Sequence, residues 1–307
     1  MFRQLYRGVA FILLSVYTLS AQTAQPHNWT DTRLNNGLRV ILQEDHRAPV
    51  YSIAIIYDVG SRNEVPGRTG FAHLFEHMMY QGSANVGKGE QMLLVQENGG
   101  RMNGTTTQDR TAYFEELPAN QLDLGLFLES DRMRALVVTQ ETLDNQRNAV
   151  QEERRLRIDN QPYGVLFELL PAMVYDNFAY KHSTIGSMAD LTAATLQDVQ
   201  EFFRTYYAPN NATLALVGDF DGNVALAKVK KYFEGIPSQP APKAIDYREP
   251  AQTKERRVTV EDPFAAQPII LFAFKTVTTN TPDYYALETL MNVLGGGGER
   301  RGFTSRW

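Results

Sequence analysis

Strand-like and helix-like segments follow one another without a regular repeat, and this irregular order constrains the fold of the 307-residue chain most strongly. The pair Asn36–Gly37 is a strong hairpin signal between two strand-like segments, and a further strand is predicted over residues 50–59. Residues 71–80 then carry apolar side chains at helical spacing. Without a regular strand–helix–strand repeat, the sequence predicts an α+β fold in which a mixed or antiparallel sheet packs against helices.

Later segments continue this mixture of strands and helices. The stretch 102–114 is rich in threonine, tyrosine and phenylalanine and predicts one strand, and residues 213–218 predict a buried strand. Helical spacing and helix-ending signals predict helices over residues 90–97, 120–136, 140–159, 163–175, 196–207 and 224–232.

A proline-rich stretch divides the chain into a large and a small part. Four prolines lie between residues 237 and 250, which predicts a linker over residues 236–252. We therefore expect a first domain over residues 29–235 and the start of a second α+β domain over residues 253–307. About 55 residues are too few to bury a core of their own, so this second domain is expected to be incomplete, as in a truncated reading frame. Its expected elements are strands over residues 256–260 and 269–274 and a helix over residues 283–294.

The N-terminus has the layout of a secretory signal peptide. Arg3 and Arg7 precede an apolar run over residues 8–19, and small and polar residues follow. An uncleaved anchor is the alternative interpretation, but the apolar run is shorter than the roughly 20 residues that a membrane span needs. We therefore expect residues 1–24 to be removed, leaving a periplasmic or secreted protein with no stable membrane span.

Charge and cysteine content exclude several functional classes. The 30 basic and 35 acidic residues give a formal charge of −5, so there is no basic footprint for nucleic acid and we expect no nucleic-acid partner. The chain has no cysteine, which excludes disulfides, thiol nucleophiles and thiolate metal ligands. Any metal must therefore be held by histidine and carboxylate side chains.

A pair of histidines within residues 71–80 has the spacing of a metal site. His73 and His77 are four residues apart, so on a helix they lie on one face, one turn from each other. Glu76 lies beside them and is a candidate general base for a water held by the metal. The alternative is two histidines that share a helix face by accident, although a His-x-x-acidic-His pattern arises by chance in only about one such chain in a hundred. The third ligand is open at this point: a carboxylate or another histidine.

Residues 70–80, Gly-Phe-Ala-His-Leu-Phe-Glu-His-Met-Met-Tyr, resemble the inverted zinc motif of the insulinase/pitrilysin peptidases, relatives of the mitochondrial processing peptidase. The resemblance implies a fold half like that of the processing peptidase, Zn²⁺ as cofactor, and peptides or unfolded polypeptides as substrates. It also implies that Glu153 is the third zinc ligand, because residues 147–153 match the helix that carries this ligand in the family. Glu152 is the rival ligand, and an ion pair with Arg157 is the alternative role of Glu153.

A second stretch resembles the strand of this family that binds substrate. Residues 98–100, 103–107 and 109–114 carry the similarity, and the exposed edge of the family's strand pairs with the substrate backbone. The alternative is an ordinary threonine-rich strand. The resemblance implies the following substrate-binding residues: Asn103, Gly104, Thr105 and Thr106.

Two departures from the family pattern limit what the resemblance implies. Gln146 stands where family members often carry a glutamate, and a neutral side chain there is expected to weaken the support of the metal site. The distal half that holds substrate in the family has no counterpart in this sequence, so a second peptidase-family half or subunit is an expected partner. The leading hypothesis is a zinc metalloendopeptidase with Glu76 as general base, and the alternative is an inactive zinc-binding or partner subunit.

Overall fold

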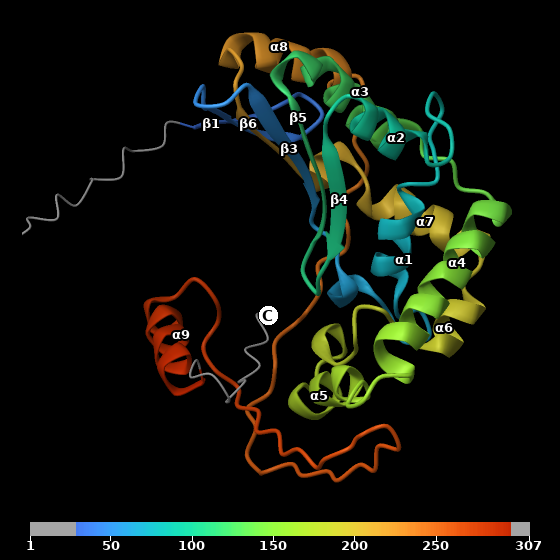
Figure 1. Cartoon of the computed structure of the whole chain (residues 1–307), viewed down its shortest axis with the longest axis vertical. Helices are drawn as coiled ribbons and strands as arrows, with labels where there is room; N and C mark the ends of the chain where they lie inside the picture. The colour runs from blue at the N-terminus through green and yellow to red at the C-terminus, as the bar shows by residue number, and fades with distance from the viewer. Residues whose placement is uncertain (1–28, 296–307) are drawn as a thin grey trace, which may run out of the picture.

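The computed structural model describes residues 29–295. The predicted signal peptide, residues 1–24, and the last part of the predicted second domain, residues 296–307, lie outside the described residues. A six-stranded sheet in the order β1-β2-β6-β3-β5-β4 forms the centre of the fold (Figure 1). The strands are β1 Thr30–Arg33, β2 Arg39–Glu44, β3 Val50–Tyr57, β4 Arg101–Thr106, β5 Thr111–Pro118 and β6 Ala212–Gly218.

Within the described residues, the strand pairing is mixed. Strands β2 and β6 are parallel, whereas β1–β2, β3–β5, β3–β6 and β4–β5 are antiparallel. The predicted hairpin joins β1 and β2, and Gly37 has a φ of 89°, a left-handed conformation that glycine adopts without strain. The pairing confirms the α+β prediction with a mixed sheet.

The helices pack mainly against one face of the sheet. Helices α1, α3 and α8 contact its strands, while α4 and α7 pack on α1 (Figure 1). The helices are α1 Phe71–Met78, α2 Glu90–Glu97, α3 Leu122–Ala135, α4 Gln140–Arg154, α5 Leu166–Val174, α6 Met188–Ala193, α7 Leu196–Tyr206, α8 Gly222–Phe233 and α9 Pro282–Gly295. None of the helices in this part of the chain is long and apolar enough to cross a bilayer.

Alternate residues of β3 separate the covered face of the sheet from its open face. Ile53 and Ile55 are fully buried beneath the helices, whereas Val50 is 48% exposed on the other face. Replacing Ile55 by Ala is expected to lower the free energy of unfolding by about 2–5 kcal/mol, because it leaves a cavity in a packed core. Urea denaturation measures this loss, and Val50→Ala in the same strand is the control. Equal losses in the two variants would contradict the proposed burial.

The sequence prediction of one strand over residues 102–114 is wrong. The structure has two strands there, β4 and β5, joined by a tight turn in which the backbone N–H of Thr107 donates to the carbonyl of Arg110 over 2.9 Å. The Thr107 hydroxyl accepts hydrogen bonds from the backbone N–H groups of Asp109 and Arg110. This side chain therefore stabilises a turn inside a stretch whose composition favours a strand.

The strands predicted over residues 256–260 and 269–274 do not form. Residues 237–281 are largely extended but unpaired, and Ile270 and Phe274 are 81% and 82% exposed. An extended segment becomes a strand only beside a hydrogen-bonding partner. The six-stranded sheet of residues 29–295 does not include either of these segments. The predicted helix does form as α9, away from the sheet (Figure 1).

Candidate metal centre

The start of helix α1 is fixed by buried hydrogen bonds. The carboxylate of Glu64, which is 6% exposed, accepts from the backbone N–H groups of Gly70 over 2.9 Å and Ala72 over 2.8 Å. A carboxylate at this end of a helix satisfies free N–H groups and favours the helix dipole. Gly70 has a φ of 86°, and an added Cβ would lie 2.5 Å from the carbonyl oxygen of Ile185. Glu64 was not among the residues predicted from the sequence, where its signal is a carboxylate shortly before a helix-starting glycine.

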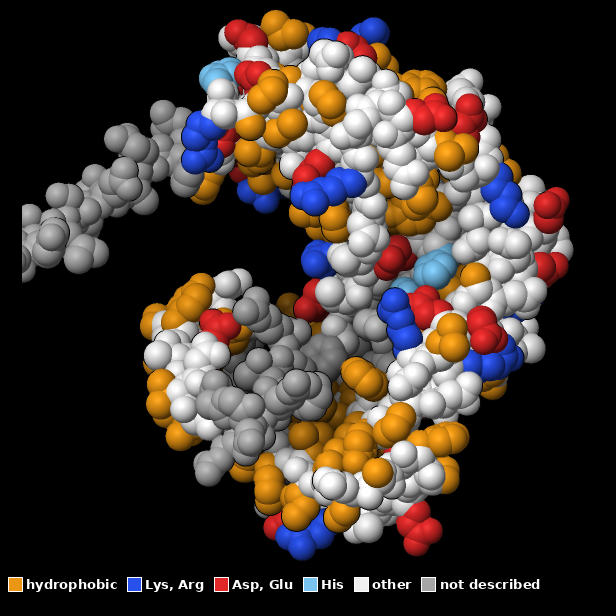
Figure 2. Space-filling view, in the orientation of Figure 1, with side chains coloured by type: hydrophobic (Ala, Val, Ile, Leu, Met, Phe, Trp, Pro, Cys, Tyr) orange, Lys and Arg blue, Asp and Glu red, His pale blue; other side chains and the backbone are white. Residues whose placement is uncertain are grey.

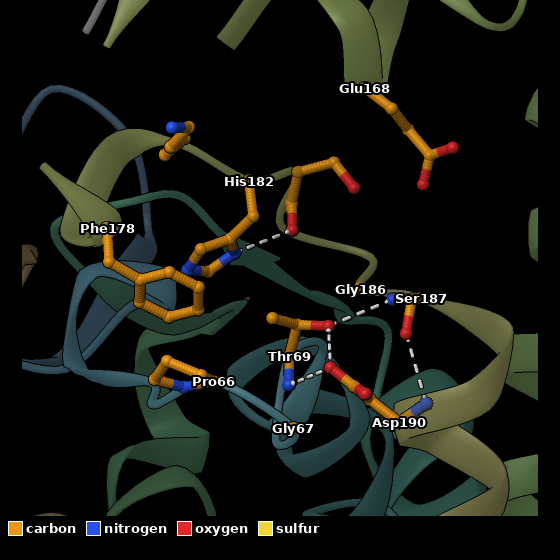
Figure 3. A pocket seen from close by; sticks show the side chains of 11 residues that line it. Pro66, Gly67, Thr69, Glu168, Phe178, His182, Gly186, Ser187 and Asp190 are labelled. Carbon is orange, nitrogen blue, oxygen red and sulfur yellow. Dashed lines mark hydrogen bonds between the residues drawn. The ribbon is translucent and has the colours of Figure 1, made fainter. Parts of the chain in front are cut away.

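A second set of bonds holds the residue before this glycine. The backbone N–H of Thr69 donates to the Asp190 carboxylate over 2.9 Å, and its hydroxyl does so over 2.5 Å. The same hydroxyl accepts from the backbone N–H of Ser187 over 3.0 Å. Figure 3 shows Thr69 between Asp190 and Ser187 at the edge of a cavity. The helix that carries the two histidines is therefore held rigidly at its beginning.

Helix α1 presents its polar residues toward β4 and α4. Phe71, Leu74 and Phe75 are buried on one side, against the sheet and α7, while His73 and His77 remain 14% and 26% exposed. Figure 2 shows histidine side chains over α1 at the surface, with carboxylate and basic side chains around them. The amphipathic spacing thus places both imidazoles on one accessible face.

Helix α4 brings Glu153 to these imidazoles. Its Oε2 atom lies 3.2 Å from Nε2 of His77 and 3.7 Å from Nε2 of His73, and one ligand atom from each residue lies within 4.8 Å of the others. Ligand atoms around a tetrahedral zinc with bonds of about 2.0–2.2 Å lie about 3.3–3.6 Å apart. The two distances from Glu153 are close to this spacing, and two imidazoles with one carboxylate form a donor set that zinc accepts.

The rival glutamate lies elsewhere. Glu152 is 58% exposed and forms an ion pair of 3.0 Å with Arg155. Glu153 makes the ion pair that was considered as its alternative role, because its Oε1 atom lies 2.7 Å from a nitrogen of Arg157. The two roles are compatible, since Arg157 contacts one carboxylate oxygen and the histidines face the other.

The protonation states of His73 and Glu153 suit metal binding. Burial, together with the neighbouring His77, lowers the pKa of His73 to about 4, so its imidazole is neutral near pH 7. The hydrogen bond with His77 lowers the pKa of Glu153, and partial burial of the carboxylate opposes this shift. Neutral imidazole and ionised carboxylate are the forms that bind a divalent ion.

Glu76 is held next to this site by a strand residue. The Thr106 hydroxyl donates to Oε2 of Glu76 over 2.5 Å. Burial raises the pKa of Glu76, and the hydrogen bond from Thr106 and the charges of His77 and Arg110 oppose the rise. A carboxylate with a raised pKa is a better proton acceptor near neutral pH. Thr106 was predicted to bind substrate, and its contact with Glu76 was not predicted.

Strand β4 is the edge of the sheet, and its register shows which backbone groups point outward. Thr107 and Arg110 form a hydrogen-bonded pair, and such pairs alternate along an antiparallel ladder, so Thr105 bonds to β5. The backbone groups of Gly104 and Thr106 therefore face away from β5. The side-chain oxygen of Asn103 accepts from the backbone N–H of Gly104 over 2.9 Å.

The remaining predicted residue, Gln146, forms its side-chain hydrogen bond with a neighbour on α4. Its side chain is 9% exposed and donates to the side-chain oxygen of Asn145 over 2.8 Å. Among the described residues, no hydrogen bond joins Gln146 to His73, His77 or Glu153. The weaker support expected from a neutral side chain stays a prediction.

Known proteins that resemble this chain include zinc peptidases. The family profile "Insulinase (Peptidase family M16)" matches residues 39–188, and "Peptidase M16 inactive domain" matches residues 193–305. The zinc protease PqqE of Helicobacter pylori is 32% identical over 296 residues, which cover 94% of this chain and 66% of that protein.

The fold is similar to that of solved protease structures. A protease from Helicobacter pylori has a TM-score of 0.71 and 33% identity, covering 73% of this chain and 54% of that one. The first half of the periplasmic protease PqqL from Escherichia coli has a TM-score of 0.66 and 24% identity, covering 73% of this chain and 49% of that one. At this identity the similarity shows a shared fold alone. The chain thus spans two thirds or less of the length of these proteins. The profile matches and the 32% identity to a zinc protease confirm the resemblance: this chain belongs to the insulinase family of peptidases, family M16.

Proposed function

We propose that this chain carries the catalytic site of a zinc-dependent metalloendopeptidase that hydrolyses peptides or unfolded polypeptides. The observation that carries the proposal is the approach of His73, His77 and Glu153 to within 4.8 Å, with Glu76 beside the two histidines on α1. These three residues would hold the zinc ion. When bound, zinc polarises the carbonyl of the peptide bond and makes the attacking water more acidic.

The residues around the ion have separate roles in proton transfer and in orienting the carboxylates. Glu76 accepts a proton from the attacking water and passes it to the leaving amine. Thr106 holds the Glu76 carboxylate in one orientation through its hydrogen bond of 2.5 Å. Arg157 holds Glu153 by the oxygen that faces away from the histidines.

Strand β4 supplies the surface for the substrate backbone. The outward backbone groups of Gly104 and Thr106 can pair with an extended peptide, and such pairing binds without strong sequence choice. Asn103 occupies the N–H of Gly104 through its side chain, so a substrate carbonyl that bonds there replaces this contact. The residues predicted from the sequence, Asn103 to Thr106, keep their proposed role in substrate binding.

Gly104 is expected to be essential for the position of the general base. A Cβ at this residue would lie 3.1 Å from Cγ and 3.3 Å from Oε1 of Glu76, and 2.8 Å from the hydroxyl of Tyr80. Gly104→Ala should lower kcat by about 10- to 100-fold, because a general base displaced by about 1 Å accepts the proton poorly. The zinc content should not change. Steady-state kinetics and metal analysis measure both quantities. Gly235→Ala, where an added Cβ has no neighbour within 4 Å, is the control. Equal kcat for the two variants would contradict this role.

A second candidate function is an inactive zinc-binding or partner subunit. Gln146 favours it, as does the match of residues 193–305 to a domain described as inactive. The deciding experiment measures zinc content and cleavage of a peptide library by this chain alone and by this chain mixed with a distal family half. Cleavage under either condition supports the peptidase, and zinc binding without any cleavage supports the inactive subunit.

We also propose an exported protein in which residues 1–24 are removed, residues 29–235 form the zinc-peptidase domain, residues 236–252 form the linker and residues 253–307 begin the second domain. Mass spectrometry of the mature protein tests the cleavage position. Limited proteolysis tests the linker, which should be cut before either flanking part.

A further inference from the structure

An arginine without an acidic partner lies in the turn that follows β4, at one end of this edge strand. Nη1 of Arg110 donates to the hydroxyl of Thr105 over 2.7 Å, and no carboxylate of the described residues forms an ion pair with it. The neighbouring Asp109 already accepts from Arg62 and Tyr180. Arg101, at the other end of the same strand, is paired with Glu116 at 2.6 Å. Arg110 therefore keeps its charge available beside the edge.

The strand register defines the face on which this charge lies. Side chains alternate along a strand, and that of Thr106 points toward Glu76. Thr105 consequently points to the opposite face, and its contact with Arg110 places the guanidinium on that face. A peptide paired with β4 also alternates, so every second side chain of the peptide passes along the Arg110 face.

We propose that Arg110 selects peptide substrates by binding an acidic side chain on that face of the paired strand. The inference rests on the proposed function, because it assumes that a peptide pairs with β4. The guanidinium has donors beyond Nη1 that a carboxylate can accept from. The recognised substrate class is an extended peptide with Glu or Asp at one position, or at two positions separated by one residue.

The test uses the full chain and a set of fluorogenic peptides that differ at one site. Glu or Lys is placed in turn at each of the positions around the cleaved bond, and the ratio of kcat/KM for the Glu and Lys peptides is measured. The wild type should favour Glu by about fivefold, the size of one exposed ion pair, at one position or at alternate positions. Arg110→Ala should bring the ratio to about one and Arg110→Glu should invert it, while Arg110→Lys should keep the preference.

Two simpler explanations are an altered general base and a general effect of removing a positive charge. Arg110 also acts on the charge of Glu76, but this effect changes the rates for the Glu and Lys peptides equally and cancels. Arg33→Ala is the matched control, since Arg33 lies on β1 at the opposite edge of the sheet and its side chain donates to the carbonyl of Gly37. A ratio that is unchanged in Arg110→Ala, or changed equally in Arg33→Ala, would overturn the proposal.

Failure of the proposed function is distinguishable from failure of this inference. If the wild type cleaves none of the peptides, fluorescence anisotropy with the same labelled peptides gives their affinities without any reaction. A preference for Glu over Lys that is lost in Arg110→Ala would still support the acidic-peptide site, and equal affinities would refute it. The preference should weaken as salt is raised, because Arg110 is only partly buried and its charge remains open to screening.

Discussion

Replacing Glu76 by Gln is expected to lower kcat for peptide hydrolysis by about a thousandfold, with zinc content unchanged. The amide cannot accept the proton of the attacking water, and a positioned general base contributes about 10²–10⁴ to the rate. Gln has nearly the same size and can still accept the hydrogen bond from Thr106, so the fold around α1 is preserved. Single-turnover kinetics and metal analysis of the purified variant measure the two effects.

Two comparisons make this result specific. Glu97→Gln changes an exposed glutamate of α2 outside the site and should leave kcat unchanged. Thr106→Ala removes the hydroxyl that orients Glu76 and should reduce kcat less than Glu76→Gln does. A Glu76→Gln variant with a near-normal rate would refute the assignment of the general base, whatever its zinc content.

Local patterns in the sequence predicted the part of the site that lies on one helix. His73, Glu76 and His77 are close because of helical spacing alone, and α1 forms over the expected residues. Glu153 lies on α4, and no local pattern joins the two helices. Its place came from the family resemblance, and the structure adds that Oε2 faces the histidines while Oε1 faces Arg157.

Contacts between distant segments could not be read from the sequence. The bond from Thr106 to Glu76 depends on how β4 packs on α1, and the bonds that Glu64 accepts depend on a loop that folds back on the helix. The two predicted strands beyond the linker failed for a related reason. Their composition favours extended structure, but a strand needs a partner, and partners are a property of the whole fold.

The backbone of β4 is another feature that depends on contacts beyond the local sequence. Residues 103–106 were predicted to bind substrate as a group, whereas the register separates them by direction. Gly104 and Thr106 present backbone groups outward, while Thr105 bonds to β5 and supports Arg110. This alternation depends on the turn at residues 107–110, which the sequence analysis did not predict.

Replacing Glu153 by Gln is expected to weaken zinc binding far more than the same change at Glu152. Losing even a supporting partner of a zinc ligand costs about 10- to 100-fold in affinity, and the loss of a charged ligand should exceed this range. Glu152 faces Arg155 and solvent, so its variant should bind zinc like the wild type. Adjacent residues of the same helix, with the same chemistry, thus form a matched pair.

Zinc affinity is measured by competition with a chelator, and thermal unfolding provides a second readout. Zinc that binds only the folded state at 100 times its Kd adds about 2.7 kcal/mol to the free energy of unfolding, so the wild type and Glu152→Gln should be stabilised while Glu153→Gln is not. Arg157→Ala should fall between them, because it frees Oε1 of Glu153 but leaves Oε2 facing both histidines. Equal affinities in Glu153→Gln and Glu152→Gln would refute the His₂Glu site, and the proposed hydrolysis with it.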